Sequence, residues 1–198
     1  MQVNLYYIFY GNWTHKQEDL ITYWGNHISS TKWWEIVYLP DNNNQIAGKN
    51  GVSVKMVVHS ELTQGTTLNR PTIVNVVLDN LNANKVPFDP DGVYFVLTSL
   101  DIVVSDQCGV SCGFHSFSSY KGTPFVYGWV GEFSSSSCNP TCIPSQNTVH
   151  SPNGDVGVDG VINVMGHELA ESVTNPFYDA WQGDPNAVNE IADLCVWM

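Results

Sequence analysis

Three ionisable residues lie within five positions of one segment: His167, Glu168 and Glu171. Apolar residues recur around them every three or four positions, which predicts an amphipathic helix over residues 161–174 that ends before Pro176. A separation of four places the His167 and Glu171 side chains one turn apart on the same helix face. Zinc accepts imidazole and carboxylate ligands, and the adjacent Glu168 is placed to act as a general base. The segment therefore predicts a metal-binding helix.

This pattern is that of an H-E-x-x-H metalloprotease helix in which glutamate replaces the second histidine. The same three residues could also form a solvated polar face or a structural salt bridge. Only 13% of the chain is charged, about half of the ~25% usual in soluble domains. In a chain with so few charges, three ionisable residues opposite an apolar helix face are less readily explained by chance, so metal binding is the favoured interpretation.

A second acidic segment, residues 189–195, begins 18 residues after Glu171. Together with the helix it resembles the gluzincin metallopeptidases, in which an Asn-Glu…Asp helix follows H-E-x-x-H. The resemblance implies that Glu190 is the third zinc ligand and that Asp193 orients His167. This chain departs from that family in carrying Glu171 instead of a second histidine, and in a Glu190-to-Asp193 step that is one residue shorter.

Two further positions offer ligand chemistry. His115 follows Cys112 closely and is predicted to act as a fourth ligand or to assist catalysis at an oxyanion; the alternative is a hydrogen-bonded loop histidine. Asp155 and Asp159 lie in the glycine-rich stretch 153–160 and could hold calcium, although the spacing is not that of an EF-hand. The other interpretation of this stretch is a tight turn that leads into the metal-binding helix.

The charge balance excludes two classes of partner. The 198 residues include 7 Lys+Arg and 19 Asp+Glu, which gives a formal charge of −12. Nucleic acids and anionic membranes both require clustered basic residues, so neither is an expected partner. No apolar stretch is long enough to span a bilayer. The length predicts a single domain, residues 1–198.

The cysteines indicate an oxidising compartment and hence a secreted protein. Two close pairs, Cys108 with Cys112 and Cys138 with Cys142, allow three disulfide pairings among which the sequence does not choose, and Cys195 stands apart. A zinc ribbon is the alternative. Residues 105–151, rich in Gly, Ser and Pro, are expected to be loop-rich and tied by disulfides.

Apolar patterning predicts the remaining elements of an α+β fold with a mixed sheet packed against the metal-site helix. A capping box at Thr14 and Gln17 predicts the start of another helix. Strands are expected at 3–10, 33–39, 52–58, 93–98 and 125–130, and helices at 14–30, 73–81 and 161–174.

The opening strand with its Tyr-Gly-Asn-Trp turn is followed by five characteristic blocks: 92–99, 108–115, 125–131 with its following cysteines, 152–160 and 173–177. In these segments, which extend over most of the chain, the sequence resembles the plant phosphate-induced and Exordium-like family of secreted proteins. The resemblance implies an apoplastic or cell-wall protein with growth-linked roles and no settled enzymatic activity.

These observations lead to one main hypothesis and two alternatives. The main one is a secreted zinc-dependent hydrolase of zincin-like architecture, an endopeptidase acting on a peptide or protein substrate. The first alternative is a non-catalytic extracellular module that binds cell-wall glycan or peptide. The second is a protein in which the metal is purely structural.

Overall fold

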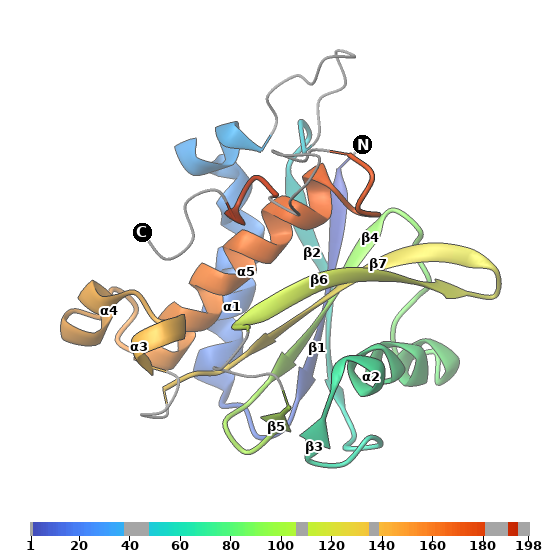
Figure 1. The fold of residues 1–198 in the computed structure, drawn as a ribbon, viewed down its shortest axis with the longest axis horizontal. Helices are drawn as coiled ribbons and strands as arrows, with labels where there is room; N and C mark the ends of the chain where they lie inside the picture. Colours follow the sequence, from blue (N-terminus) through green and yellow to red (C-terminus); the bar gives the residue numbers. More distant parts are fainter. Residues whose placement is uncertain (1, 38–47, 106–110, 135–138, 181–189, 194–198) are drawn as a thin grey trace.

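The fold is built on one mixed sheet with strand order β2-β1-β4-β7-β6 (Figure 1). The computed structural model describes residues 2–37, 48–105, 111–134, 139–180 and 190–193. Neighbouring strands are parallel except at one edge, where β6 runs antiparallel to β7. The strands are β1 (Val3–Tyr10), β2 (Val52–Ser60), β4 (Gly92–Thr98), β6 (Gly113–Tyr120) and β7 (Thr123–Gly131), with a separate parallel pair of β3 (Thr67–Leu68) and β5 (Val103–Val104).

Helices cover both faces of the sheet. In Figure 1, α1 (His15–His27) and α5 (Val156–Thr174) lie on one face, and α2 (Arg70–Asn82) lies on the other. Both α1 and α2 begin with a capping box, at Thr14 and Asn69 respectively, which confirms the predicted Thr14–Gln17 box. The shorter helices are the 3₁₀ helices η1 (Ile28–Ser30) and η2 (Lys32–Ile36), and α3 (Asn139–Cys142) and α4 (Ser145–Val149).

Strand β1 shows how the sheet is buried on both sides. Successive side chains of a strand point to opposite faces, so a strand between two helical layers is apolar throughout rather than alternating. The core below α1 and α5 takes Leu5, Tyr7 and Phe9. The core below α2 takes Tyr6, Ile8 and Tyr10. The continuous apolar pattern is therefore a consequence of two cores.

The longest helix, α5, begins five residues earlier than its apolar spacing predicts. Asp155 caps it by accepting a hydrogen bond from the Val158 amide, 3.1 Å away. At the sheet, a Cβ on Gly113 would lie 2.6 Å from Val164 of α5 and 3.1 Å from a Glu168 oxygen. Glycine at the start of β6 thus allows this strand to approach the helix that carries the predicted metal ligands.

The expected mixed sheet packed against the site helix is confirmed, but the class is α/β rather than α+β. Parallel neighbours need crossover connections, and here α1 joins β1 to β2 while α2 lies between β2 and β4 in the sequence.

Within the described residues, no helix has the length and apolar character to cross a membrane.

Two expectations about local structure were wrong. Residues 33–39 were expected as a strand, yet η2 occupies Lys32–Ile36, and residues 38 and 39 lie outside the described residues; Trp34 and Val37, three positions apart, are both buried, which suits a helical turn. In the region 105–151, β7 confirms the strand expected at 125–130, whereas β6 lies where a loop was expected. Cys112 and Cys142 form a disulfide. Cys108, Cys138 and Cys195 lie outside the described residues.

Removing the disulfide is expected to destabilise the fold by about 3–4 kcal/mol. Cys112 and Cys142 are separated by 30 positions, and closing a loop of that length restricts the unfolded chain by about this free energy. The measurement is urea unfolding of the Cys112→Ser/Cys142→Ser double variant. A midpoint equal to that of the wild type would contradict the prediction.

Candidate metal centre

Helix α5 presents three ionisable side chains to the sheet edge. Glu168 and Glu171 are buried, whereas the His167 side chain keeps 24% of its surface exposed. His167 Nε2 lies 3.1 Å from Glu171 Oε1, as expected for positions i and i+4 on one helix face. The sequence-predicted pair is therefore in contact.

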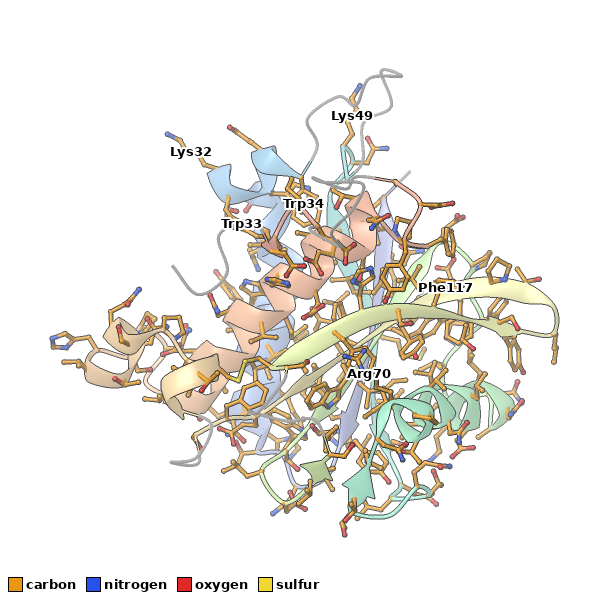
Figure 2. All side chains as sticks on the ribbon, viewed as in Figure 1. Lys32, Trp33, Trp34, Lys49, Arg70 and Phe117 are labelled. Atoms are coloured by element: carbon orange, nitrogen blue, oxygen red, sulfur yellow. A yellow bond between two sulfur atoms is a disulfide. The ribbon has the colours of Figure 1, made fainter. Side chains whose placement is uncertain are left out.

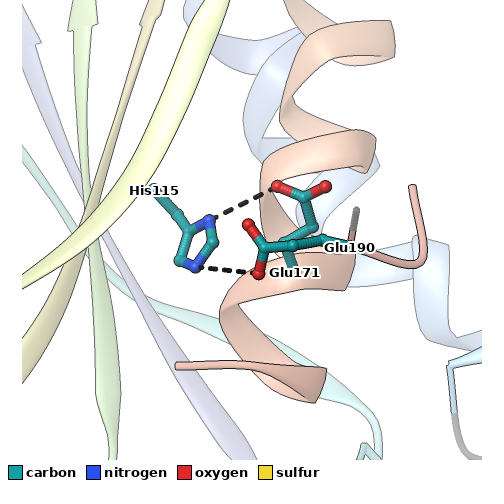
Figure 3. A group of neighbouring side chains, drawn as sticks. All are labelled: His115, Glu171 and Glu190. Atoms are coloured by element: carbon teal, nitrogen blue, oxygen red, sulfur yellow. Dashed lines mark ion pairs between the residues drawn. The ribbon is translucent and has the colours of Figure 1, made fainter. Parts of the chain in front are cut away.

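Strand β6 contributes His115 from the opposite side, and its side chain is almost completely buried. His115 Nδ1 lies 3.4 Å from Glu171 Oε2 and 3.9 Å from Glu168 Oε2. Its other nitrogen, Nε2, lies 3.2 Å from the Asn175 carbonyl oxygen and 3.7 Å from Glu190 Oε1. Figure 3 shows the two ion pairs as dashed lines, one from each nitrogen of the imidazole to the Glu171 and Glu190 carboxylates.

The segment 190–193 closes the site. Glu190 is buried and accepts a hydrogen bond from the side-chain amide of Asn175, at 2.6 Å. Asp193 Oδ1 lies 3.3 Å from His167 Nε2. The nitrogen that faces Glu171 therefore also faces Asp193. An aspartate that only oriented a metal-bound His167 would be expected at the other ring nitrogen, Nδ1.

The six residues singled out as ligands or catalytic groups come together, and two expected pairs, His167 with Glu171 and His167 with Asp193, are in contact. Glu190 was expected to join His167 and Glu171; it is grouped with Glu171 and His115. Asp193 contacts Nε2 of His167, the nitrogen that also faces Glu171. Two further residues of the site, Asn175 and Tyr178, were not identified from the sequence. Asn175 binds Glu190, and the Tyr178 hydroxyl donates a 2.5 Å hydrogen bond to the His115 carbonyl from a left-handed backbone with φ of 60°.

Burial and mutual charge shift the pKa values of the site. Burial raises the pKa of Glu168 to about 8, against the opposing influence of His167. Burial would lower the pKa of His167, but the carboxylates, Glu171 first, outweigh it and raise this pKa to about 9. Burial would raise the pKa of Glu171, yet its contacts with His115 and His167 keep it below the usual value. Without a cation, the site therefore retains protons that compensate its negative charge.

The donor set fits a divalent metal ion. Among the described residues, two groups have ligand atoms within 4.8 Å of one another: His115 with Glu171 and Glu190, and His167 with Glu168 and Glu171. Glu171 Oε1 is buried and accepts no hydrogen bond from the described residues, although His167 is adjacent. A buried carboxylate oxygen is costly unless a well-aligned donor or a cation satisfies it, and the His167 imidazole is close to this oxygen without being well aligned. Both groups offer the nitrogen and oxygen ligands that zinc accepts.

The carboxylates of Asp155 and Asp159, in the loop and first turn of α5, make hydrogen bonds within this segment. Asp155 caps the helix, and buried Asp159 accepts hydrogen bonds from Ser151 at 2.5 Å and from Asn153 at 2.6 Å. Neither aspartate belongs to a group of candidate ligands within the described residues. These contacts support the interpretation as a helix-leading turn, while the calcium hypothesis stays a prediction.

Fold and site together define an α/β domain with a buried, carboxylate-rich candidate metal centre at the edge of a mixed sheet. The chain belongs to the family described as "Phosphate-induced protein 1 conserved region", which it matches over residues 1–198. This confirms the Exordium-like resemblance. No solved structure matches the chain.

Curated plant proteins are similar along nearly the whole chain. Protein EXORDIUM-like 5 of Arabidopsis thaliana is 35% identical, over 98% of this chain and 60% of that protein. Protein EXORDIUM-like 3 of the same plant is 36% identical, over 98% of this chain and 64% of that protein. Protein PHOSPHATE-INDUCED 1 of Nicotiana tabacum is 28% identical, over 98% and 67%. The chain thus spans about three fifths of the length of the first two relatives, and none of these names states an enzymatic activity.

Proposed function

We propose that this chain is an extracellular metal-binding protein whose zinc ion supports the hydrolysis of a peptide or protein substrate. The observation that carries the proposal is the buried Glu171 Oε1, which lies 3.1 Å from His167 Nε2 as an ion pair but without the geometry of a hydrogen bond, as two ligand atoms around one cation would. The Cys112–Cys142 disulfide supports an extracellular location, because disulfides persist in oxidising compartments.

The proposed zinc ligands are His167 and Glu171, which belong to one group of neighbouring candidate ligands, and Asp193, which lies outside that group but contacts the same imidazole nitrogen. Bonds of about 2.0 Å in tetrahedral directions separate two ligand atoms by about 3.3 Å. His167 Nε2 lies 3.1 Å from Glu171 Oε1 and 3.3 Å from Asp193 Oδ1, close to that separation. Glu190, the third ligand implied by the gluzincin resemblance, lies nearer to His115 and is considered below. A zincin-like arrangement is part of this proposal, since a helix with His-Glu-x-x-Glu packs on the sheet edge.

The zinc ion, Glu168 and His115 would have different roles in the proposed hydrolysis. A bound zinc ion supplies Lewis acidity and lowers the pKa of water. Glu168 would accept the proton of the attacking water, because its carboxylate lies in the same group of neighbouring side chains as the proposed ligands His167 and Glu171. His115 holds Glu171 from the side of the sheet, so it positions this carboxylate.

The metal content of the purified protein tests the proposal. Wild-type protein prepared without added metal is expected to contain at least one zinc ion per chain. His167→Ala is expected to lower zinc affinity by roughly 100-fold or more, because even partners of metal ligands contribute 10–100-fold. The matched control is His150→Ala, at an exposed histidine outside the site. Sub-stoichiometric zinc that does not differ between wild type and His167→Ala would contradict the proposal.

The second candidate function is a non-catalytic binding module for cell-wall glycan or peptide. The relatives' names agree better with this candidate than with a hydrolase, because they state no enzymatic activity. Exposed aromatic side chains beside the site also favour it. Phe117 on β6 (Figure 2) lies 5.6 Å from Phe177 and 5.8 Å from Tyr178 between ring centroids. Such rings provide apolar faces for a ligand.

A further inference from the structure

The two groups of candidate ligands share one residue, Glu171, and use different oxygens of it. Oε1 faces His167 Nε2 at 3.1 Å, and Oε2 faces His115 Nδ1 at 3.4 Å. Glu171 is 3% exposed, and its carboxylate lies between an imidazole of α5 and an imidazole of β6. A carboxylate that has an imidazole nitrogen next to each of its oxygens is arranged to bridge two metal ions, one bound with each imidazole.

The charges of the site also suit two cations. Glu168, Glu171, Glu190 and Asp193 carry four negative charges when ionised. In the described part of the chain their ion pairs are all made with His115 or His167. Metal-binding imidazoles are neutral, so one divalent ion would leave two negative charges uncompensated at a largely buried site, whereas two divalent ions would balance all four.

The second half of the site is complete without His167. His115, Glu171 and Glu190 are all buried, and their ligand atoms lie within 4.8 Å of one another. Asn175, which is fully buried, fixes Glu190 with its side chain and accepts from His115 Nε2 with its carbonyl. Metal ligands are commonly held by outer partners of this kind. The combined set of two imidazoles and four carboxylates is also that of di-iron and di-manganese carboxylate proteins.

We propose that the centre binds two divalent cations bridged by the Glu171 carboxylate. The first is held by His167 Nε2 and Asp193. The second is held by His115 through Nδ1, because its Nε2 donates to the Asn175 carbonyl, and by Glu190 from the same group of neighbouring candidate ligands. Two-metal sites place their ions about 3.5–4 Å apart, within the span of one bridging carboxylate. Glu168 lies beside both imidazoles, where it can serve a water between the ions. This inference rests on the proposed function, because the first ion is the one proposed above.

Counting ions in the intact chain tests the inference. After saturation with Zn²⁺ and removal of the excess, the wild type is expected to hold two zinc ions per chain by mass spectrometry. Glu190→Gln is expected to hold one, since it keeps His167 and Asp193. Glu35→Gln, at an exposed carboxylate, is the matched control and is expected to hold two. Circular dichroism checks that each variant is folded.

Mn²⁺ provides a second readout that needs no variant. Two manganese ions bridged by one carboxylate are expected to give an exchange-coupled electron paramagnetic resonance signal. One zinc ion in the wild type and an uncoupled manganese signal would overturn the two-metal inference and leave the proposed function standing. Two ions retained by Glu190→Gln would place the second ion elsewhere and would also overturn it. No bound ion in the wild type would overturn both proposals.

Discussion

A chelator is expected to lower the melting temperature of the wild-type protein by about 8–16 °C. A metal ion that binds only the folded state at a free concentration 1,000 times its dissociation constant stabilises that state by about 4 kcal/mol. In a domain of this size, each kcal/mol shifts the melting temperature by about 2–4 °C. Removing the metal also leaves Glu168, Glu171 and Glu190 buried together, with only His115 and His167 as ion-pair partners among the described residues.

The measurement is differential scanning calorimetry of zinc-loaded protein with and without EDTA at neutral pH. Glu171→Gln is the informative variant, because it removes the carboxylate common to both ligand groups. Its melting temperature is expected to change by less than about 2 °C on addition of EDTA. Chelator sensitivity that is equal in wild type and Glu171→Gln would show that the stabilising metal binds at another place.

Local patterns were enough to predict the elements that carry most of the core. The spacing of apolar residues predicts α5 up to Thr174, and the continuous apolar run predicts β4. In both cases the apolar residues that become buried follow a regular spacing within the element, so the pattern is visible in the local sequence. The start of α5 was predicted late, because the glycines and Asp159 in residues 156–160 favour a turn, although Asp155 caps the helix and Val158 is buried in the core.

The edge strand β6 could not be predicted in the same way. Its sequence, Gly-Phe-His-Ser-Phe-Ser-Ser-Tyr, is rich in serine, and only Phe114 and His115 in it are buried. What holds it is pairing with β7, which the hairpin turn between Tyr120 and Thr123 makes possible. An exposed edge strand needs little apolar character, so composition alone favoured a loop.

The candidate site was predictable as a set of residues but only in part as a set of contacts. His167 and Glu171 are four positions apart on one helix, so their contact follows from helix geometry. The contacts of Glu171 with His115 and of His167 with Asp193 join segments far apart in the chain. Spacing in the sequence does not say which nitrogen of an imidazole faces which carboxylate. In the structure Asp193 faces Nε2 of His167, the same nitrogen that faces Glu171, and Glu190 faces His115.

Glu168→Gln is expected to reduce hydrolysis by 10²- to 10⁴-fold while the metal stays bound. The substitution keeps the size of the side chain and removes only its capacity to accept a proton, which contributes this factor in general base catalysis. Glu168 is outside the proposed ligand set, and its carboxylate lies 3.9 Å from His115 Nδ1. The measurement is cleavage of a fluorogenic peptide library, with zinc counted in the same samples.

The same variant separates the two candidate functions. Glu35→Gln serves as the control, since this exposed carboxylate lies outside the site. A hydrolase loses activity in Glu168→Gln and in the presence of a chelator, but not in the control. If peptide cleavage is equal in wild type and Glu168→Gln, Glu168 is not the base. If the wild type cleaves no peptide, and glycan or peptide binding survives both the chelator and Glu168→Gln, the binding module is the function of the chain. The buried carboxylates of α5 would then serve the stability of the domain.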